Sequence, residues 1–232
     1  MVRQLSFVRV YNFNSTTNQW NQLGDDINGE AACDSSGNSV SLSLNGKTVA
    51  IGAAGNDDNG SNSGHVCVYT FNSSMSQWNQ LGDDIDGEAS SDVSGGYSLS
   101  LSSNGKTVAI GALGNDGNGI DSGHVHVFNF NSNNNEWTQL GDDIDGKAVD
   151  DWSSYDSVSL SSGGNRVVIG AYRNDDNGSN SGHVHVYEFD SINNQWTKLG
   201  DDINGEVAHD YSGVSVSLSL FRQKDCCDWC LS

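Results

Sequence analysis

The sequence predicts an all-β fold, a β-propeller of four-stranded antiparallel blades, and three observations support this fold class. A nearly identical stretch of sequence recurs along the chain: Trp20, Trp78, Trp137 and Trp196 lie 58, 59 and 59 residues apart. The apolar residues gather in strand-length runs, and no segment repeats with a helical period. Self-similarity at such a period indicates a repeat architecture in which each copy folds into one structural unit.

One copy, residues 97–144, shows the four strands in order. The first candidate, 97–102, alternates leucine with serine, which is the period-2 pattern of a strand. An Asn-Gly pair at 104–105 follows, and this pair is typical of a tight hairpin turn. The second strand, 106–112, is apolar on both faces, and the third and fourth strands are expected at 123–130 and 137–144.

The other two complete copies repeat this order. We expect their first strands at 39–44 and 157–161, their second at 47–53 and 166–171, their third at 64–71 and 182–189, and their fourth at 78–85 and 196–203. A sheet that is apolar on both faces must be covered on both faces, and blades arranged around an axis achieve this. The small serines of the first strand fit the crowded position next to that axis. A β-sandwich is the alternative fold, and it accounts less well for the repeated text.

The predicted domain organisation is a single propeller array over residues 1–220, with complete blades at about 39–85, 97–144 and 156–203. Residues 7–27 match third and fourth strands, and residues 213–220 match a first strand, so these segments form a partial blade. Either they close a four-bladed ring, or the chain is an arc of a larger propeller, which we favour slightly. The divergent tail, 221–232, contains Asp, Arg and Lys, which argues against its replacing the missing second strand.

The charge balance disfavours several classes of partner. The chain has 10 Lys and Arg against 30 Asp and Glu, a formal net charge of −20. This charge disfavours binding to nucleic acid and to anionic membrane surfaces. No run reaches the ~18 apolar residues that a membrane span needs, so no membrane insertion is expected. The first residues lack the apolar core of a secretory signal, and the compartment stays open.

The five cysteines form no even framework. Cys226, Cys227 and Cys230 crowd the tail, and the last two have the CxxC spacing of a redox or zinc half-site. A structural zinc site needs about four ligands, and the sequence holds no second CxxC pair. We therefore expect a divergent tail without a metal.

The stretch from the first to the third strand resembles the FG-GAP repeat of integrin α-subunit propellers. The matching pieces are SVSLS at 39–43, VAIGA at 49–53 and GHVCVY at 64–69, with equivalents in each later copy. The resemblance implies a β-propeller, usually of seven blades, that acts in ligand binding and adhesion outside the cell or at its surface. The family's calcium loop, D-x-[DN]-x-DG, has no match between the first two strands, so no metal ligand is carried over.

Two acidic loops are candidate cation sites on their own composition. The first, NDDNG or NDGNG, holds an aspartate and an asparagine two residues apart in every full copy: Asp57 and Asn59, Asp116 and Asn118, and Asp175 and Asn177. Calcium favours several such oxygen ligands, so these six residues are the predicted metal site and calcium the only predicted cofactor. Turn capping explains the same pattern without a metal, and we favour it over a cation site. The second loop, DDIDGE with Asp84, Asp86 and Glu88, also suits calcium, but Lys147 replaces Glu88 in the next copy.

Histidines recur on the third strands. His124 and His126 stand two residues apart, as do His183 and His185 in the following copy, while the first full copy has His65 and Cys67. Residues i and i+2 of a strand share a face, so each pair could present two ligands together. Zinc needs a third protein ligand, and none is evident nearby in the sequence. We therefore expect these side chains to pack between blades.

The predicted function is that of a non-enzymatic recognition or adhesion module that binds a protein or a glycan through its loops. The sequence holds no GxSxG, no HExxH and no phosphate-binding glycine loop. One alternative is an incomplete propeller fragment without independent function. Another is a propeller hydrolase or lyase with its centre near the axis, where Tyr97, Asp156 and His209 break the repeat.

Overall fold

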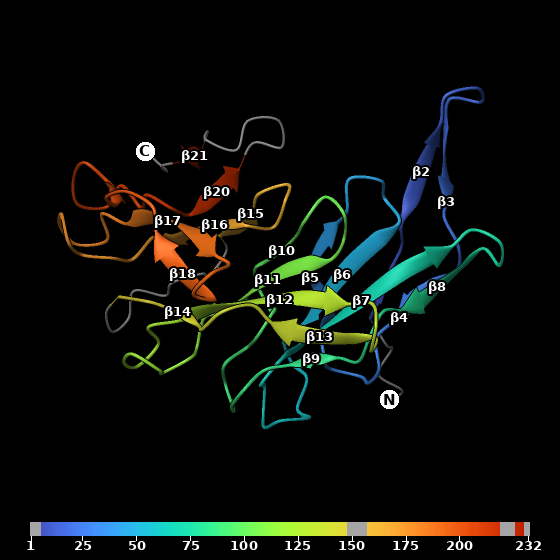
Figure 1. The fold of residues 1–232 in the computed structure, drawn as a ribbon, viewed down its shortest axis with the longest axis horizontal. Coiled ribbons are helices and arrows are strands. Elements are labelled where there is room, and N and C mark those ends of the chain that lie inside the picture. The colour runs from blue at the N-terminus through green and yellow to red at the C-terminus, as the bar shows by residue number, and fades with distance from the viewer. Residues whose placement is uncertain (1–5, 148–156, 219–225, 230–232) are drawn as a thin grey trace.

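The structure, a computed structural model, describes residues 6–147, 157–218 and 226–229, and this part of the chain is entirely strands, turns and loops (Figure 1). Its strands form three five-stranded and three two-stranded antiparallel sheets, as the predicted all-β propeller fold requires. No helix able to cross a membrane occurs in these residues.

The three five-stranded sheets are the blades. The first blade contains β5 (Ser36–Leu42), β6 (Thr48–Ala53), β7 (His65–Asn72), β8 (Gln77–Gln80) and β9 (Ile85–Asp86). The second contains β10 (Leu99–Leu101), β11 (Thr107–Ala112), β12 (His124–Asn131), β13 (Glu136–Gln139) and β14 (Ile144–Asp145). The third contains β15 (Val158–Leu160), β16 (Arg166–Ala171), β17 (His183–Asp190), β18 (Gln195–Lys198) and β19 (Ile203–Asn204).

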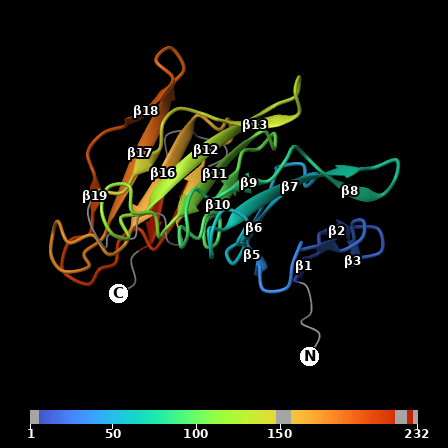
Figure 2. The ribbon, with the colours of Figure 1, turned by 90° about the horizontal axis from the view of Figure 1, so that it is seen from below.

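Two partial blades flank this row. The N-terminal partial blade contains β1 (Phe7–Val8), β2 (Tyr11–Asn14), β3 (Gln19–Gln22) and β4 (Ile27–Asn28), in which β1 pairs with β4 and β2 with β3. The C-terminal partial blade contains β20 (Ser215–Leu218) and β21 (Cys226–Trp229). The two partial blades lie at opposite ends of the row of sheets (Figures 1 and 2).

The tail corrects one expectation. β21 pairs antiparallel with β20, with Ser217 opposite Cys227, in the place where the second strand of a full blade pairs with the first. Of the charged residues on which that expectation rested, Arg222, Lys224 and Asp225 precede this strand in the sequence, and Asp228 lies within it. Residues 219–225 and 230–232 lie outside the described residues.

The fourth strand of each blade is split, which the sequence analysis did not predict. In the first blade both β8 and β9 pair with β7, and the Leu81 amide still donates to the Val68 carbonyl at 2.7 Å, but Gly82, Asp83 and Asp84 leave the ladder. Gly82 has a φ of 76°, a left-handed conformation that favours glycine. The same break follows β13 and β18. The repeated LGDD sequence therefore marks an interruption of the fourth strand.

The core lies between the blades, as the two-sided apolar second strands predicted. β6 and β11 are buried along their whole length. Ala50 and Val66 of the first blade pack with Leu99 and Ile110 of the second in one apolar cluster, and an equivalent cluster joins the second blade to the third. Each blade thus buries its apolar faces against its neighbours, and burial at roughly 25 cal/mol per Å² makes this stacking the main stabilising term.

The inner strands are joined by serine hydroxyls. The Leu101 amide donates to Ser41 Oγ of the preceding blade at 3.0 Å, and the Leu160 amide donates to Ser100 Oγ at 3.0 Å. The Leu218 amide donates to Ser159 Oγ at 3.1 Å. An edge strand carries N–H groups that its own sheet does not pair, so these serines satisfy donors that would be costly to bury alone. The serine-leucine alternation therefore does more than leave room near the axis.

The outer strands are joined by the repeated tryptophans. Trp137 Nε1 donates to the Leu81 carbonyl of the preceding blade at 2.7 Å, and the bonds from Trp78 to Leu23 and from Trp196 to Leu140 have the same length. A β-carbon on Gly82 would lie 2.8 Å from Trp137 Cδ1, so only glycine fits beneath the indole. At each of these three junctions the indole packs over the glycine of the LGDD segment and donates to the carbonyl of its leucine.

Alanine substitutions at two equivalent glycines should separate backbone strain from blade contact. Gly105 has a φ of 71°, and a β-carbon there would lie 2.7 Å from Thr48 Cβ of the preceding blade. Gly46 has a φ of 65°, and its β-carbon would meet nothing within 4 Å. We expect Gly46→Ala to cost about 1 kcal/mol of unfolding free energy through strain, and Gly105→Ala to cost about 1–3 kcal/mol more through overpacking. Urea unfolding measures both, and equal losses would contradict the packing described for this junction.

Candidate metal and catalytic centre

His124 and His126 lie together on one face of β12, as their spacing predicted. Their ring centroids are 3.9 Å apart, and the two residues are 2% and 6% exposed. Nε2 of His126 is buried and has no hydrogen-bond partner among the described residues. A buried polar atom without a partner is costly, so this nitrogen is poised for a ligand.

The broken fourth strand supplies the third ligand that the sequence analysis did not find. β14 pairs with β12, with Asp145 opposite His124, and this register brings Asp143 beside the histidine pair. Asp143 Oδ1 lies 3.4 Å from His126 Nε2. Two ligand atoms on one tetrahedral zinc ion, each ~2 Å from the metal, lie roughly 3.3 Å apart.

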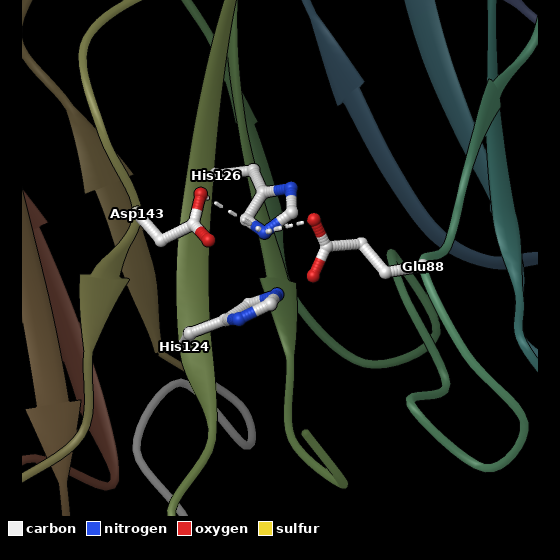
Figure 3. Close-up of side chains that lie close together, drawn as sticks. All are labelled: Glu88, His124, His126 and Asp143. Atoms are coloured by element: carbon white, nitrogen blue, oxygen red, sulfur yellow. Dashed lines mark ion pairs between the residues drawn. The ribbon is translucent and has the colours of Figure 1, made fainter. Parts of the chain in front are cut away.

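A fourth group comes from the preceding blade. Glu88 Oε1 lies 3.9 Å from His126 Nε2, and Figure 3 shows the imidazole between the carboxylates of Glu88 and Asp143. The ligand atoms of Glu88, His124, His126 and Asp143 all lie within 4.8 Å of one another. The expectation that these histidines only pack was based on a missing ligand, and the structure places two carboxylates there.

The surroundings of these side chains favour a neutral imidazole and an oriented carboxylate, both of which suit cation binding. Burial, with a smaller effect from the neighbouring charge of His126, lowers the pKa of His124 to about 3, so its imidazole is neutral at pH 7. Neutral imidazole is the form that binds metals. Gln139 Nε2 donates to Asp143 Oδ1 at 2.5 Å and so holds the carboxylate in place. Such outer contacts orient metal ligands.

The first blade has a related cluster of His65, Cys67 and Asp84, with Glu30 also within reach of His65. The Cys67 thiol donates to Asp84 Oδ1 at 3.1 Å and lies 3.5 Å from His65 Nε2. Burial, with the Asp84 carboxylate, raises the pKa of this thiol well above its usual range. The thiol therefore stays protonated at pH 7 unless a cation displaces its proton.

In the third blade, lysine ammonium groups lie where a bound cation would lie. His183, His185 and Asp202 form the cluster, and Lys147 stands where Glu88 stands one copy earlier. The Lys147 ammonium pairs with Asp176 and lies 3.8 Å from Asp202 Oδ2, while Lys198 pairs with Asp202 directly. An ammonium already neutralises this carboxylate, so the third cluster is not suited to a metal ion.

The predicted calcium residues lie in loops and make local contacts. Asp57 Oδ1 accepts from the Asn62 amide at 2.7 Å, and Asn59 Nδ2 donates to the Gly87 carbonyl at 2.8 Å. The equivalent bonds of the later copies involve Asp116, Asn118, Asp175 and Asn177. None of the three aspartates belongs to a clustered group of His, Cys, Asp and Glu within the described residues. Calcium binding at these loops stays a prediction.

The remaining candidates separate in the structure. Asp84 joins the cluster of its own blade and Glu88 joins that of the next blade, so DDIDGE is not one site. Tyr97 is 42% exposed, and His209 is exposed beside Tyr211 with ring centroids 6.0 Å apart. Asp156 lies outside the described residues.

A groove runs between the first and second blades close to the centre. Asp84, Asp86, Phe128, Glu136 and Trp137 line it, together with Asp83 and Ile85, and its volume is about 310 Å³. The Phe128 ring centroid lies 6.0 Å from that of His126. The groove therefore offers aromatic and acidic side chains beside the candidate centre.

Comparison with known proteins confirms the predicted repeat family. The model of the FG-GAP repeat family matches residues 28–69 and 144–187. No curated protein sequence matches the chain.

Solved structures with the same fold include three lactonases by name. A protein described as a 6-phosphogluconolactonase from Bacteroides fragilis has a TM-score of 0.56 and 11% identity, covering 88% of this chain and 49% of its own. A similarly described Bacteroides uniformis protein has a TM-score of 0.55 and 12% identity, covering 87% and 49%. The periplasmic gluconolactonase of Pseudomonas aeruginosa has a TM-score of 0.53 and 13% identity, covering 87% and 48%. The chain thus spans about half the length of these proteins, and the likeness shows the fold.

These comparisons correct the expected function. We expected a non-enzymatic adhesion module because the resemblance to integrin propellers was the only guide to activity. Solved propellers that match this chain are named as lactonases, which are hydrolases, so the expectation of no enzyme was wrong and the hydrolase alternative is the better supported.

The third cluster should make stability depend on pH. Burial, then the charge of His185, lowers the pKa of His183 to about 4 from an ordinary 6.5. The unfolded chain therefore binds a proton that the folded chain does not, and this contribution to stability is complete above pH 6.5 and is lost as the pH falls towards 4. We expect His183→Gln to reduce the loss by up to about 1.4 kcal/mol per pH unit in that range. Urea unfolding at several pH values measures the slope, exposed His209→Gln is the control, and an unchanged slope in the His183 variant would contradict the assignment.

Proposed function

We propose that this FG-GAP repeat protein is a metal-dependent hydrolase whose reactive centre is the cluster of Glu88, His124, His126 and Asp143. The observation that carries the proposal is the convergence of these four ligand atoms from two blades within 4.8 Å of one another. The third junction supports it, because a lysine ammonium takes the place of the cation there. Two imidazoles and a carboxylate with one open position are a typical catalytic zinc set.

The roles follow from the burial of each side chain. His124, His126 and Asp143 come from one blade and are the proposed ligands of a zinc ion. Glu88 comes from the neighbouring blade, and its side chain is 51% exposed, so it would be free to accept a proton from a water molecule beside the three ligands. Zinc lowers the pKa of bound water to ≈ 7, and a carboxylate beside it can accept the proton.

The proposed substrate is an ester or a lactone, the bond type that the names of the similar propellers indicate. The water oxygen bonds to the carbonyl carbon while Glu88 takes a proton from the water. The ester C–O bond then breaks, and the leaving alkoxide receives that proton from Glu88. The products are a carboxylic acid and a hydroxyl group, so atoms and charge balance without a further reactant. The groove that Phe128 and Trp137 line is the proposed path for the substrate.

Zinc titration of the chelator-treated protein tests the metal part. We expect His126→Gln to remove one zinc equivalent measured by calorimetry, because Nε2 of His126 is buried and faces both carboxylates of the centre. The matched control is His185→Gln, since the third cluster already holds lysines. The double substitution Lys147→Glu and Lys198→Gln gives the third cluster the residues of the second, so it should add one equivalent of bound zinc. Identical stoichiometry in all four proteins would refute the metal centre.

Hydrolysis assays test the catalytic part. The zinc-loaded protein should hydrolyse activated esters such as p-nitrophenyl acetate and simple δ-lactones, and the chelated protein should not. Glu88→Gln should lower kcat by about 10²–10⁴-fold, the usual contribution of a general base, while zinc affinity falls little. Glu206→Gln, at the position of Glu88 in the last copy of the repeat, is the control. Zinc binding without any turnover would leave the centre a structural metal site and would overturn the enzymatic proposal.

A further inference from the structure

The inner faces at the two ends of the blade row are uncovered. Within the row, inner-strand leucines Leu99 and Leu101 are only 9% and 7% exposed, because the preceding blade covers them. The equivalent residues of the first blade, Val40 and Leu42, are 53% and 50% exposed. The N-terminal partial blade covers the outer part of this face through Ile27, but it has no strand over β5 at these positions.

The opposite end has the complementary groups. Ser41, Ser100 and Ser159 each accept an amide of the next inner strand. Ser217 is the next serine in this series; it is exposed, and no such contact is made to it within the described residues. The amide that would follow in the series is that of Leu42, at the far end of the row.

The outer strands show the same complementarity. Trp20 is 68% exposed, whereas its three counterparts are partly buried against a leucine carbonyl and a glycine of the preceding blade. Leu199 and Ile203 are 46% and 44% exposed, and a β-carbon on Gly200 would meet nothing within 4 Å. Ile27, Ile85 and Ile144, the counterparts of Ile203, are 5–6% exposed. At the N-terminal end of the row, Trp20 therefore has no leucine carbonyl and glycine to pack on among the described residues. At the C-terminal end, Leu199 and Gly200 have no tryptophan of the described part of the chain packed on them.

The partial blades are halves of one blade. β20 and β21 occupy first-strand and second-strand positions, while β1 with β2 and β3 with β4 correspond to third and fourth strands. The free edges of β21 and of β1 and β2 are unpaired within the described residues, and unpaired edges favour pairing with another strand. In this structure the halves lie at opposite ends of the row, so they do not join each other (Figures 1 and 2).

We propose that two copies of this chain associate head to tail and complete each other's partial blades, forming a closed propeller with two shared blades. β21 of one copy pairs with β1 and β2 of the other, Ser217 accepts the Leu42 amide, and Trp20 donates to the Leu199 carbonyl. A second copy is the occupant that fits, because the missing contacts are those that the chain already makes between its own blades.

A two-fold axis satisfies both junctions at once. Each contact from one copy to its partner is repeated in the opposite direction, as closed two-fold symmetry requires. Each copy carries a formal net charge of −20, so the copies repel one another at low ionic strength. Salt screens this repulsion, and we expect association to strengthen as salt rises to about 0.15 M, where the Debye length is ≈ 8 Å.

Sedimentation equilibrium with three variants tests the assembly. The unaltered chain should reach twice its mass of 24.7 kDa at micromolar concentration. Trp20→Ser removes the donor, and Gly200→Ala places a β-carbon where the partner's indole packs, so each should raise the dimer dissociation constant at least tenfold. Met75→Ser is the control, because Met75 is 62% exposed in the β7–β8 hairpin, away from both end faces.

Mixing the two variants distinguishes a contact from a folding defect. In a dimer of one Trp20→Ser chain and one Gly200→Ala chain, one junction keeps both native residues and the other loses both. The mixture should therefore associate more tightly than either variant alone. A monomeric mass for the unaltered chain up to high micromolar concentration would overturn the proposal, as would a dimer that is indifferent to both substitutions.

Discussion

The tryptophan that reaches from each blade to the preceding one determines most of the local geometry of this array. Trp196 donates to the Leu140 carbonyl at 2.7 Å, so that carbonyl must leave the ladder of its own sheet. The fourth strand breaks at this point, and Gly141 takes a left-handed conformation with a φ of 75°. Residues 141–143 then loop out before β14, which places Asp143 beside the histidine pair. The contact that holds the blades together thus also assembles the candidate centre.

The same scaffold carries different chemistry at its three junctions. The first combines a histidine, a thiol and carboxylates; the second combines two histidines and two carboxylates; the third replaces one carboxylate with an ammonium. The backbone register is the same in all three, with His65, His124 and His183 opposite the last residue of the short strand β9, β14 or β19. The second and third clusters differ at two positions, where Glu88 and Gln139 of the second are replaced by Lys147 and Lys198 of the third.

The strand order, the inner position of the serine-leucine strands and the stacking of blades could be predicted from the sequence, because period and alternation are local. The split of the fourth strand could not, since the turn at Leu81 and Gly82 depends on an indole from the following blade. The third ligand was missed for a related reason: Asp143 lies 17 residues after His126, and only the register of β14 brings them together. The place of β21 was missed because the charged residues of the tail were taken to argue against a strand, although three of them precede β21 and it accommodates Asp228. Function was predicted least well, because it rested on resemblance before any site was visible.

The candidate centre at the second junction spans the boundary between two blades. Glu88 belongs to the first blade, whereas His126 and Asp143 belong to the second, so the 3.9 Å from Glu88 to His126 depends on the angle between the blades. A rotation of a few degrees about the inner strands would move the outer carboxylate while leaving the two ligands of the second blade in register. A cation bound at this proposed centre would therefore be coupled thermodynamically to the curvature of the array: a change in the arc would alter the affinity of the centre, and the bound ion would oppose that change with equal free energy.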